Sequence, residues 1–143
     1  MPAPLRWTVL VIAVGGGLGS LARYGLGQAW PDTGHWVPWT TLSINLAGSL
    51  LLGMLVVAVA EIWRPHPLVR PLLGTGVLGG FTTFSTFAVQ TRALAAGPAA
   101  GYLVLSVGGG VLAAALGMWL ARLPHAVPAL THEPVDPLDP DLP

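Results

Sequence analysis

Long apolar stretches, separated by short segments rich in proline and polar residues, run from the N-terminus to about Leu123. The chain has four long intervals without internal charges, and these are Arg6–Arg23, Asp32–Glu61, Arg70–Arg92 and Arg92–Arg122. A helix needs about 20 mainly apolar residues to cross the hydrocarbon core of a membrane. Three intervals are long enough outright, and the first is long enough if Arg23 lies at the far end of its helix. The pattern therefore predicts an all-α membrane protein with four transmembrane helices.

The predicted helices cover residues 5–26, 40–62, 68–95 and 99–123, and the segments between them contain proline or glycine. Residues 1–123 then form one four-helix transmembrane domain. The first apolar segment resembles a signal peptide, but its length, its glycines and the three spans that follow favour a retained helix. Residues 124–143 are rich in proline and acid and cannot bury a core, so we expect a disordered tail.

Composition narrows the class of protein further. Apolar residues make up 53% of the chain, its net charge is zero, and it has no cysteine. The balanced charge gives no electrostatic basis for binding nucleic acid. The lack of cysteine excludes disulfides, zinc–thiolate sites and thiol catalysis within the chain. No nucleophile–base pair or metal-ligand cluster is visible in the predicted spans, so we do not expect an enzyme.

The few charges also bear on orientation. Four spans place both termini on one side of the membrane, together with Arg6, Arg64, Arg70 and Arg122, while Arg23 and Arg92 lie on the other side. This positive-inside bias is weak. A chain with so slight a preference can insert in both orientations and pair antiparallel. Four helices enclose little space, so a conduction path suggests a dimer or a larger assembly.

In the first helix, small residues recur four apart, as in Gly15 with Gly19 and Gly16 with Ser20. This spacing is typical of helices that approach each other closely. A dinucleotide-binding loop is the alternative, but no strand–turn–helix unit surrounds these glycines. Arg23 follows near the end of the span. It either extends to the membrane surface or pairs structurally, or it attracts anions to a pathway.

The third predicted helix contains the sequence GGFTTFSTF at residues 79–87. Two adjacent glycines weaken a helix by about 1 kcal/mol each, and the hydroxyls that follow offer the backbone competing hydrogen bonds. A break here exposes backbone groups that must be satisfied by protein or by a water-filled cavity. Phenylalanine ring edges are positively polarised and can face an anion. The alternative is an intact helix whose hydroxyls bond to the preceding turn.

Two other spans carry polar side chains one turn apart. Thr41 and Asn45 share a face of the second helix, and Tyr102 and Ser106 share a face of the fourth. For Asn45 the alternative is an interhelical hydrogen bond worth about 1 kcal/mol. No carboxylate lies in the interior of a span. A small-molecule or cation antiporter of dual topology, the main alternative function, would need such an acid.

Three segments in order, GGGLGSLARYGLG, TLSINLAGSLLLG and GTGVLGGFTTFSTF, resemble the small fluoride channel family, known as Fluc or CrcB. The resemblance implies a dual-topology antiparallel homodimer in the plasma membrane or the bacterial inner membrane, surrounded by lipid. It also implies two pores at the subunit interface. The implied function is passive export of cytoplasmic fluoride down its electrochemical gradient, without ATP.

The resemblance also implies roles for individual residues. Phe84 and Phe87 match the two phenylalanines whose ring edges face fluoride, and Asn45 and Thr41 match polar pore residues of the second helix. Arg23 matches an arginine at the end of the first helix. The other implied pore positions are Thr83, Ser85, Thr86, Tyr102 and Ser106. A further hydroxyl expected one turn after Ser106 is replaced by Gly110.

A structural sodium ion is the one cofactor that the resemblance implies. Gly79 and Thr82 match the pair whose backbone carbonyls hold this ion on the dimer axis. A two-fold axis would supply carbonyl oxygens from both chains, and such hard ligands suit a hard cation.

Overall fold

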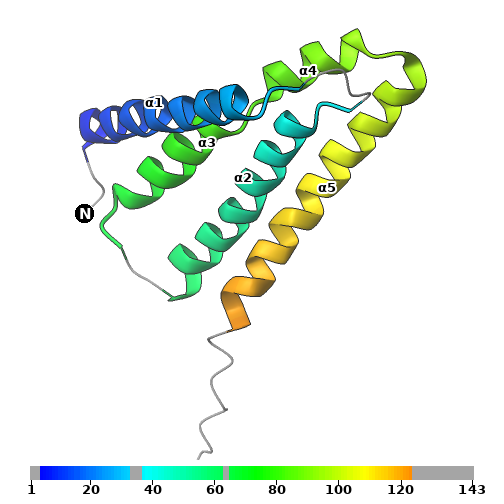
Figure 1. Cartoon of the computed structure of the whole chain (residues 1–143). Coiled ribbons are helices and arrows are strands. Elements are labelled where there is room, and N and C mark those ends of the chain that lie inside the picture. Colours follow the sequence, from blue (N-terminus) through cyan, green and yellow to red (C-terminus); the bar gives the residue numbers. More distant parts are fainter. Residues whose placement is uncertain (1–3, 33–36, 63–64, 124–143) are drawn as a thin grey trace, which may run out of the picture.

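The computed structural model describes residues 4–32, 37–62 and 65–123 (Figure 1). Within them every element is helical, in the order α1 (Leu5–Ala29), α2 (Trp39–Val57), η1 (Ala58–Ile62), η2 (Pro71–Leu78), α3 (Gly79–Phe81), α4 (Phe84–Ala93) and α5 (Ala96–Arg122). The segments η1 and η2 are π-helical. The predicted tail at residues 124–143 lies outside the described residues.

These elements join into four helices that are long and apolar enough to cross a membrane: Leu5–Ala29, Trp39–Ile62, Pro71–Ala93 and Ala96–Arg122. The four predicted spans and the all-α fold are therefore confirmed. Each predicted helix end lies within about one turn of the observed end.

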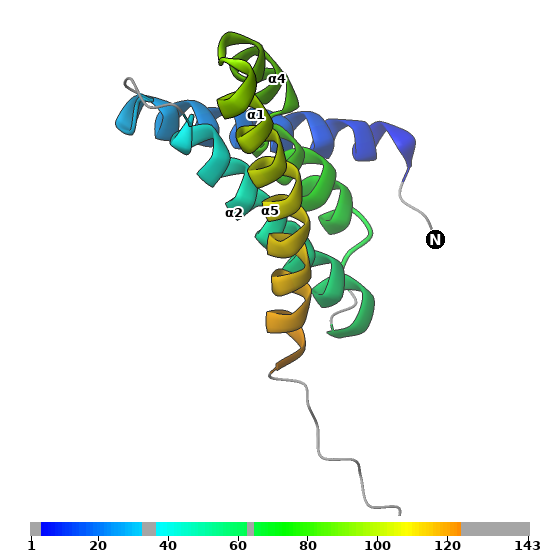
Figure 2. The ribbon, with the colours of Figure 1, turned by 90° about the vertical axis from the view of Figure 1, so that its right-hand side faces the viewer.

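The helices form two packed pairs. α2 and α5 run side by side along most of their lengths, and α1 packs along η2 and α3. The view turned by 90° shows that α1 crosses the direction of α5 at a steep angle (Figure 2). The third span thus lies between α1 and α2, and its break faces α2 on one side and α1 on the other.

Small residues bring α1 and the third span together, as their spacing predicts. A Cβ atom added to Gly15 would lie 2.6 Å from the Leu72 carbonyl oxygen. One added to Gly19 would overlap the Val77 carbonyl and lie 2.8 Å from the Phe81 nitrogen. Real Cβ atoms do not approach backbone this closely, so α1 can pack here only with glycine at both positions.

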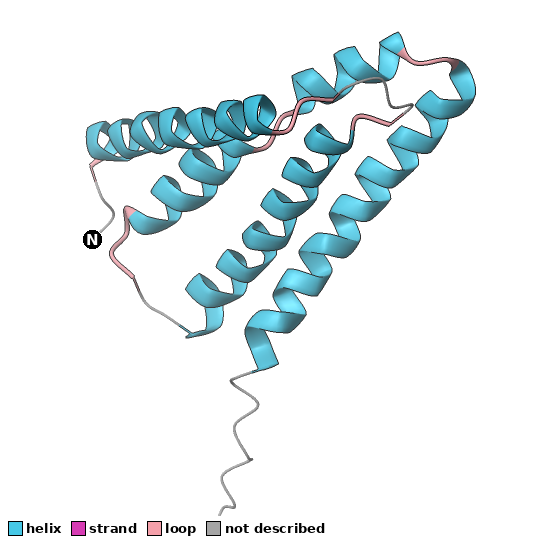
Figure 3. Cartoon of the chain, viewed as in Figure 1, coloured by secondary structure: helices cyan, strands magenta, loops and turns pink. Residues whose placement is uncertain are grey.

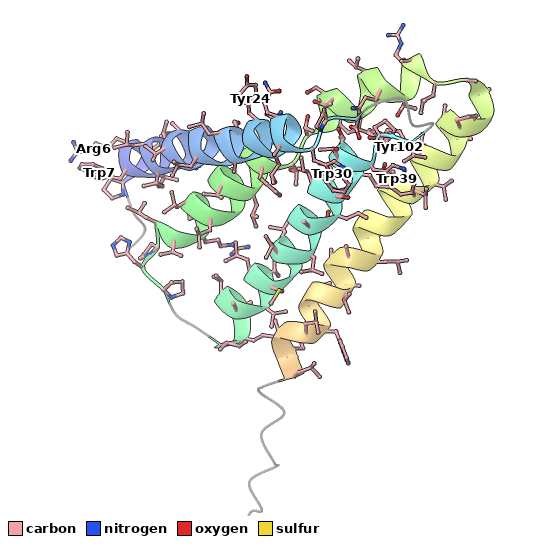
Figure 4. All side chains as sticks on the ribbon, in the orientation of Figure 1. Arg6, Trp7, Tyr24, Trp30, Trp39 and Tyr102 are labelled. Carbon is pink, nitrogen blue, oxygen red and sulfur yellow. The ribbon has the colours of Figure 1, made fainter. Side chains whose placement is uncertain are left out.

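Most large apolar side chains face outward, because the apolar core is small. A buried cluster joins Val37, Leu42, Phe87 and Tyr102. Four tryptophans among the described residues are exposed: Trp7, Trp30 and Trp39 lie at or near the ends of α1 and α2 (Figure 4), and Trp119 lies near the end of α5. Outward apolar side chains with tryptophan at helix ends are typical of a membrane-embedded surface.

Candidate functional site

The third span is interrupted at two residues. α3 ends at Phe81, and Thr82 (φ −76°, ψ 158°) and Thr83 (φ −144°, ψ 120°) are extended before α4 begins at Phe84 (Figure 3). The predicted break is therefore confirmed. It follows the glycine pair and does not lie within it, because Gly79 and Gly80 remain helical. A Cβ atom at Gly80 would collide with the Gly16 carbonyl, so this glycine serves close packing against α1.

Asn45 of α2 holds the interrupted backbone through both ends of its side-chain amide. The Thr83 backbone N–H donates to Asn45 Oδ1 at 2.8 Å, and Asn45 Nδ2 donates to the Thr83 carbonyl at 3.0 Å. This pair replaces helical hydrogen bonds that the extended residues cannot make. The interhelical hydrogen bond considered from the sequence is therefore present. Because an asparagine amide has two N–H donors, one remains for another acceptor.

The start of α4 is capped by a hydroxyl. Thr83 Oγ1 accepts from the Thr86 backbone N–H at 3.2 Å and lies 3.0 Å from Thr86 Oγ1 and 3.3 Å from Ser85 Oγ. Thr83 is thus an N-cap residue, a position that favours threonine. Its backbone binds Asn45 while its side chain satisfies α4. One residue therefore fixes both sides of the break.

The end of α3 is satisfied from α1. Arg23 Nε donates to the Gly80 carbonyl at 3.2 Å, and Ser20 Oγ donates to the same oxygen at 3.4 Å. These contacts show Arg23 in structural pairing, which is one of its two predicted roles; the other is attraction of anions. The nitrogens Nη1 and Nη2 make no hydrogen bond with the described residues, so the guanidinium still has donors for an anion.

A cavity of about 320 Å³ lies beside the break, between α2, α5 and the third span. It is lined by Asn45, Gly48, Ser49, Leu52, Gly74, Leu78, Gly79, Thr82, Thr83, Phe84, Phe87, Ser106 and Val107. No side chain in this set is charged. The cavity combines amide and hydroxyl donors with two phenylalanine rings, whose centroids are 5.8 Å apart with planes tilted by 50°. Such a lining can solvate an anion without a formal positive charge.

A second cavity, of about 390 Å³, is lined by Arg23, Thr41, Thr86 and also by Thr83, which lines the first cavity too. The Thr83 backbone and its contact with Asn45 therefore lie between the two spaces. Asp32 also lines the second cavity, where its Oδ1 accepts from the Thr40 N–H at 2.9 Å. Most of the predicted site residues thus line one of two cavities, one on each side of Thr83.

Two predicted pore residues line neither cavity. Tyr102 is fully buried, its ring centroid lies 5.2 Å from that of Phe87, and its hydroxyl donates to Gln90 Oε1 at 3.0 Å. Ser85 is exposed and lies beside the Thr83 hydroxyl. Within this chain the buried Tyr102 ring therefore packs against the Phe87 ring. Figure 4 shows Tyr102 at the same end of the molecule as Trp30 and Trp39.

The carbonyl groups of Gly79 and Thr82 fit a hard cation. Both residues line the first cavity, and neither carbonyl accepts a hydrogen bond from the described residues. The Thr82 hydroxyl donates to the Leu78 carbonyl at 3.0 Å and is therefore engaged elsewhere. Where the chain is described, no group of three or more histidine, cysteine or acidic residues could hold a metal. At these two residues the oxygens left free to bind a cation are those of the backbone.

Two features of the structure are not predicted from the sequence: Ser49 in the first cavity and the ion pair between Arg122 and Glu61. Ser49 lines the first cavity, and its place four residues after Asn45 on α2 was an available signal. The ion pair between Arg122 and Glu61 has Arg122 Nη2 2.6 Å from Glu61 Oε1 and Arg122 Nε 3.0 Å from Oε2. It joins the ends of η1 and α5. Nothing in the local sequence pairs these two residues, which lie far apart along the chain.

Comparison with known proteins identifies the family of this chain. Residues 10–118 match the family of CrcB-like proteins (Camphor Resistance, CrcB). The fluoride-specific ion channel FluC 1 of Streptomyces coelicolor is 44% identical over 113 residues, covering 79% of this chain and 73% of that protein. FluC 2 of Nocardia farcinica is 43% identical over 118 residues, covering 80% of this chain and 84% of that protein.

FluC 2 of Streptomyces avermitilis, another fluoride-specific ion channel, is 49% identical over 86 residues. The matched part is 60% of this chain and about half of that longer protein, at 54%. The family match extends from α1 to α5 and includes the broken span and both cavities. The chain is therefore a multi-pass membrane protein that belongs to the CrcB-like family.

Proposed function

We propose that this chain is a fluoride-selective channel that lets cytoplasmic fluoride leave passively down its electrochemical gradient. The observation that carries the proposal is the uncharged cavity beside the broken third span, lined by Asn45, serine and threonine hydroxyls, Phe84 and Phe87. The relatives in this family are named fluoride-specific ion channels, which supports the same ion. Since those relatives are channels, the expectation of a non-enzyme is also supported.

The lining suits the chemistry of fluoride. This ion is small and strongly hydrated, so a selective path must replace its water with closely spaced donors. Arg23 attracts the anion toward the second cavity. At the break, the remaining N–H of Asn45 and the serine and threonine hydroxyls donate hydrogen bonds to it. The phenylalanine edges then contact the dehydrated ion. A formal charge deep in the path would hold the anion too tightly, because conduction requires release as well as entry.

The active unit is an antiparallel homodimer of dual topology with two pores at its interface. Phe84 lines the cavity yet is 80% exposed in the single chain, which supports a path completed by a second copy. The carbonyls of Gly79 and Thr82 would hold the structural sodium ion, together with the same groups of the second copy. When bound, this ion would supply positive charge that stabilises the broken backbone.

An antiporter remains the alternative function, and the structure offers it little support. Among the described residues of the spans, the one acidic side chain is Glu61, at the end of η1, where it pairs with Arg122. Proton-coupled transport depends on ionisable groups inside the membrane. The cavity beside the break has none in its lining.

The deciding experiment is ion efflux from liposomes that contain the purified full-length chain. A fluoride electrode follows fluoride release after an ionophore relieves the membrane potential, and a chloride electrode follows chloride from matched liposomes. We expect rapid fluoride release and chloride release no faster than from protein-free liposomes. Absence of fluoride release, or equal release of both ions, would refute the channel proposal.

A further inference from the structure

Two hydroxyl groups in the cavity beside the break make no hydrogen bond with the described residues. Ser106 Oγ is fully buried and without a partner. Ser49, which lines the same cavity from α2, is also absent from the hydrogen bonds of the described part of the chain. The Ser49 hydroxyl thus keeps a free O–H donor beside a space of about 320 Å³, whereas the Ser106 hydroxyl lies buried at the edge of that space.

Unpaired helical hydroxyls need an explanation. Serine and threonine inside helices usually bond back to the carbonyl four residues earlier. Thr82 and Thr91 of this chain do so, donating to Leu78 and Phe87 at 3.0 and 2.8 Å. A buried hydroxyl without a partner costs about 1–3 kcal/mol. Of these two hydroxyls only that of Ser106 is buried and bears this cost, while the Ser49 hydroxyl is accessible and can bind a polar occupant of the cavity.

Gly110 leaves room beside Ser49. α2 and α5 run side by side, and a Cβ atom built on Gly110 would lie 3.5 Å from Ser49 Oγ. The Ser49 hydroxyl therefore lies opposite residue 110, one turn beyond Ser106 on α5. Because residue 110 has no side chain, the hydroxyl at this level of the cavity comes from α2.

We propose that Ser49 is an ion-binding residue of the conduction path, donating its O–H to the anion at the level of Gly110 while Ser106 donates one turn earlier. With Asn45, these groups form a series of uncharged donors along the cavity. This inference rests on the proposed channel function. It assigns to α2 a hydroxyl donor that α5 does not supply at this level, because residue 110 is glycine.

The test compares Ser49→Ala with Ser43→Ala in the liposome efflux assay. Ser43 lies on the same helix, and it lines neither this cavity nor the one that contains Arg23. A hydrogen bond to a charged group contributes enough that its loss lowers fluoride release roughly tenfold. We expect this loss for S49A and none for S43A. The double variant S49A/G110S, which returns a hydroxyl from α5 to the same level, is expected to recover most of the flux.

The outcomes separate this inference from the function on which it rests. Absence of flux in the unaltered protein would refute the channel itself. Wild-type flux in S49A would overturn the role of Ser49 and leave the channel intact. A reduced S49A flux that G110S does not restore, with unchanged gel-filtration elution, would assign the loss to altered packing and would also overturn the inference.

Discussion

At the scale of single residues, Asn45 and Thr83 determine where the third span stops being helical. One side-chain amide satisfies both the N–H and the carbonyl of Thr83, at 2.8 and 3.0 Å. A buried backbone group left unpaired in a membrane is costly. The extended conformation at Thr83 therefore depends on residue 45 being able to donate and accept at once.

Asn45→Asp tests this dependence. Aspartate keeps the acceptor for the Thr83 N–H but loses the donor to the Thr83 carbonyl, and its charge repels an anion in the cavity. We expect fluoride efflux to fall below detection and the free energy of unfolding to fall by about 1–3 kcal/mol. Liposome flux and thermal unfolding in detergent measure the two effects. Wild-type flux in a correctly assembled N45D protein would show that Asn45 does not line the path.

Much of this site could be predicted from residue types, because amides, hydroxyls and glycines are conspicuous in apolar helices. The composition of residues 79–87 predicts a break, with an intact helix as the alternative. Its partner was not predictable in the same way. Asn45 lies 38 residues before Thr83, and a contact of that kind depends on how the helices pack. The break consequently falls after the glycine pair, where Asn45 can reach the backbone.

At the scale of helices, the glycines of α1 control how closely it approaches the third span, and so whether Arg23 reaches the Gly80 carbonyl. Gly19→Ala tests this packing, because a Cβ atom there overlaps the Val77 carbonyl. Overpacking of this kind costs about 1–3 kcal/mol. Gly17→Ala is the matched control, since a Cβ atom there has nothing within 4 Å.

Thermal unfolding in detergent is the measurement for this pair of variants. We expect G19A to unfold at a clearly lower temperature than the unaltered protein. G17A should match or slightly exceed it, because alanine favours helix over glycine by about 1 kcal/mol. Equal stability of the two variants would mean that α1 is not held against the third span as closely as described.

At the scale of the whole molecule, a single chain leaves part of the proposed ion path exposed on its surface. Phe84 is 80% exposed although it lines the cavity, and the outer faces of α1 and α5 carry many exposed leucines and valines. Lipid can cover the outer faces, but an ion path at the protein surface needs a second protein wall. The few arginines give little preference for one orientation. These features together favour two copies inserted in opposite directions.

Labelling of a single cysteine measures orientation directly, because the chain has no cysteine of its own. Gly97→Cys suits this purpose, since position 97 is exposed near the start of α5 and a Cβ atom there has nothing within 4 Å. A maleimide that cannot cross membranes is added to intact cells, and a second label is added after lysis. For dual topology with so weak a charge bias we expect about half of the molecules to react from outside. Labelling of nearly all or nearly none would establish a single orientation, and an antiparallel dimer could then not form.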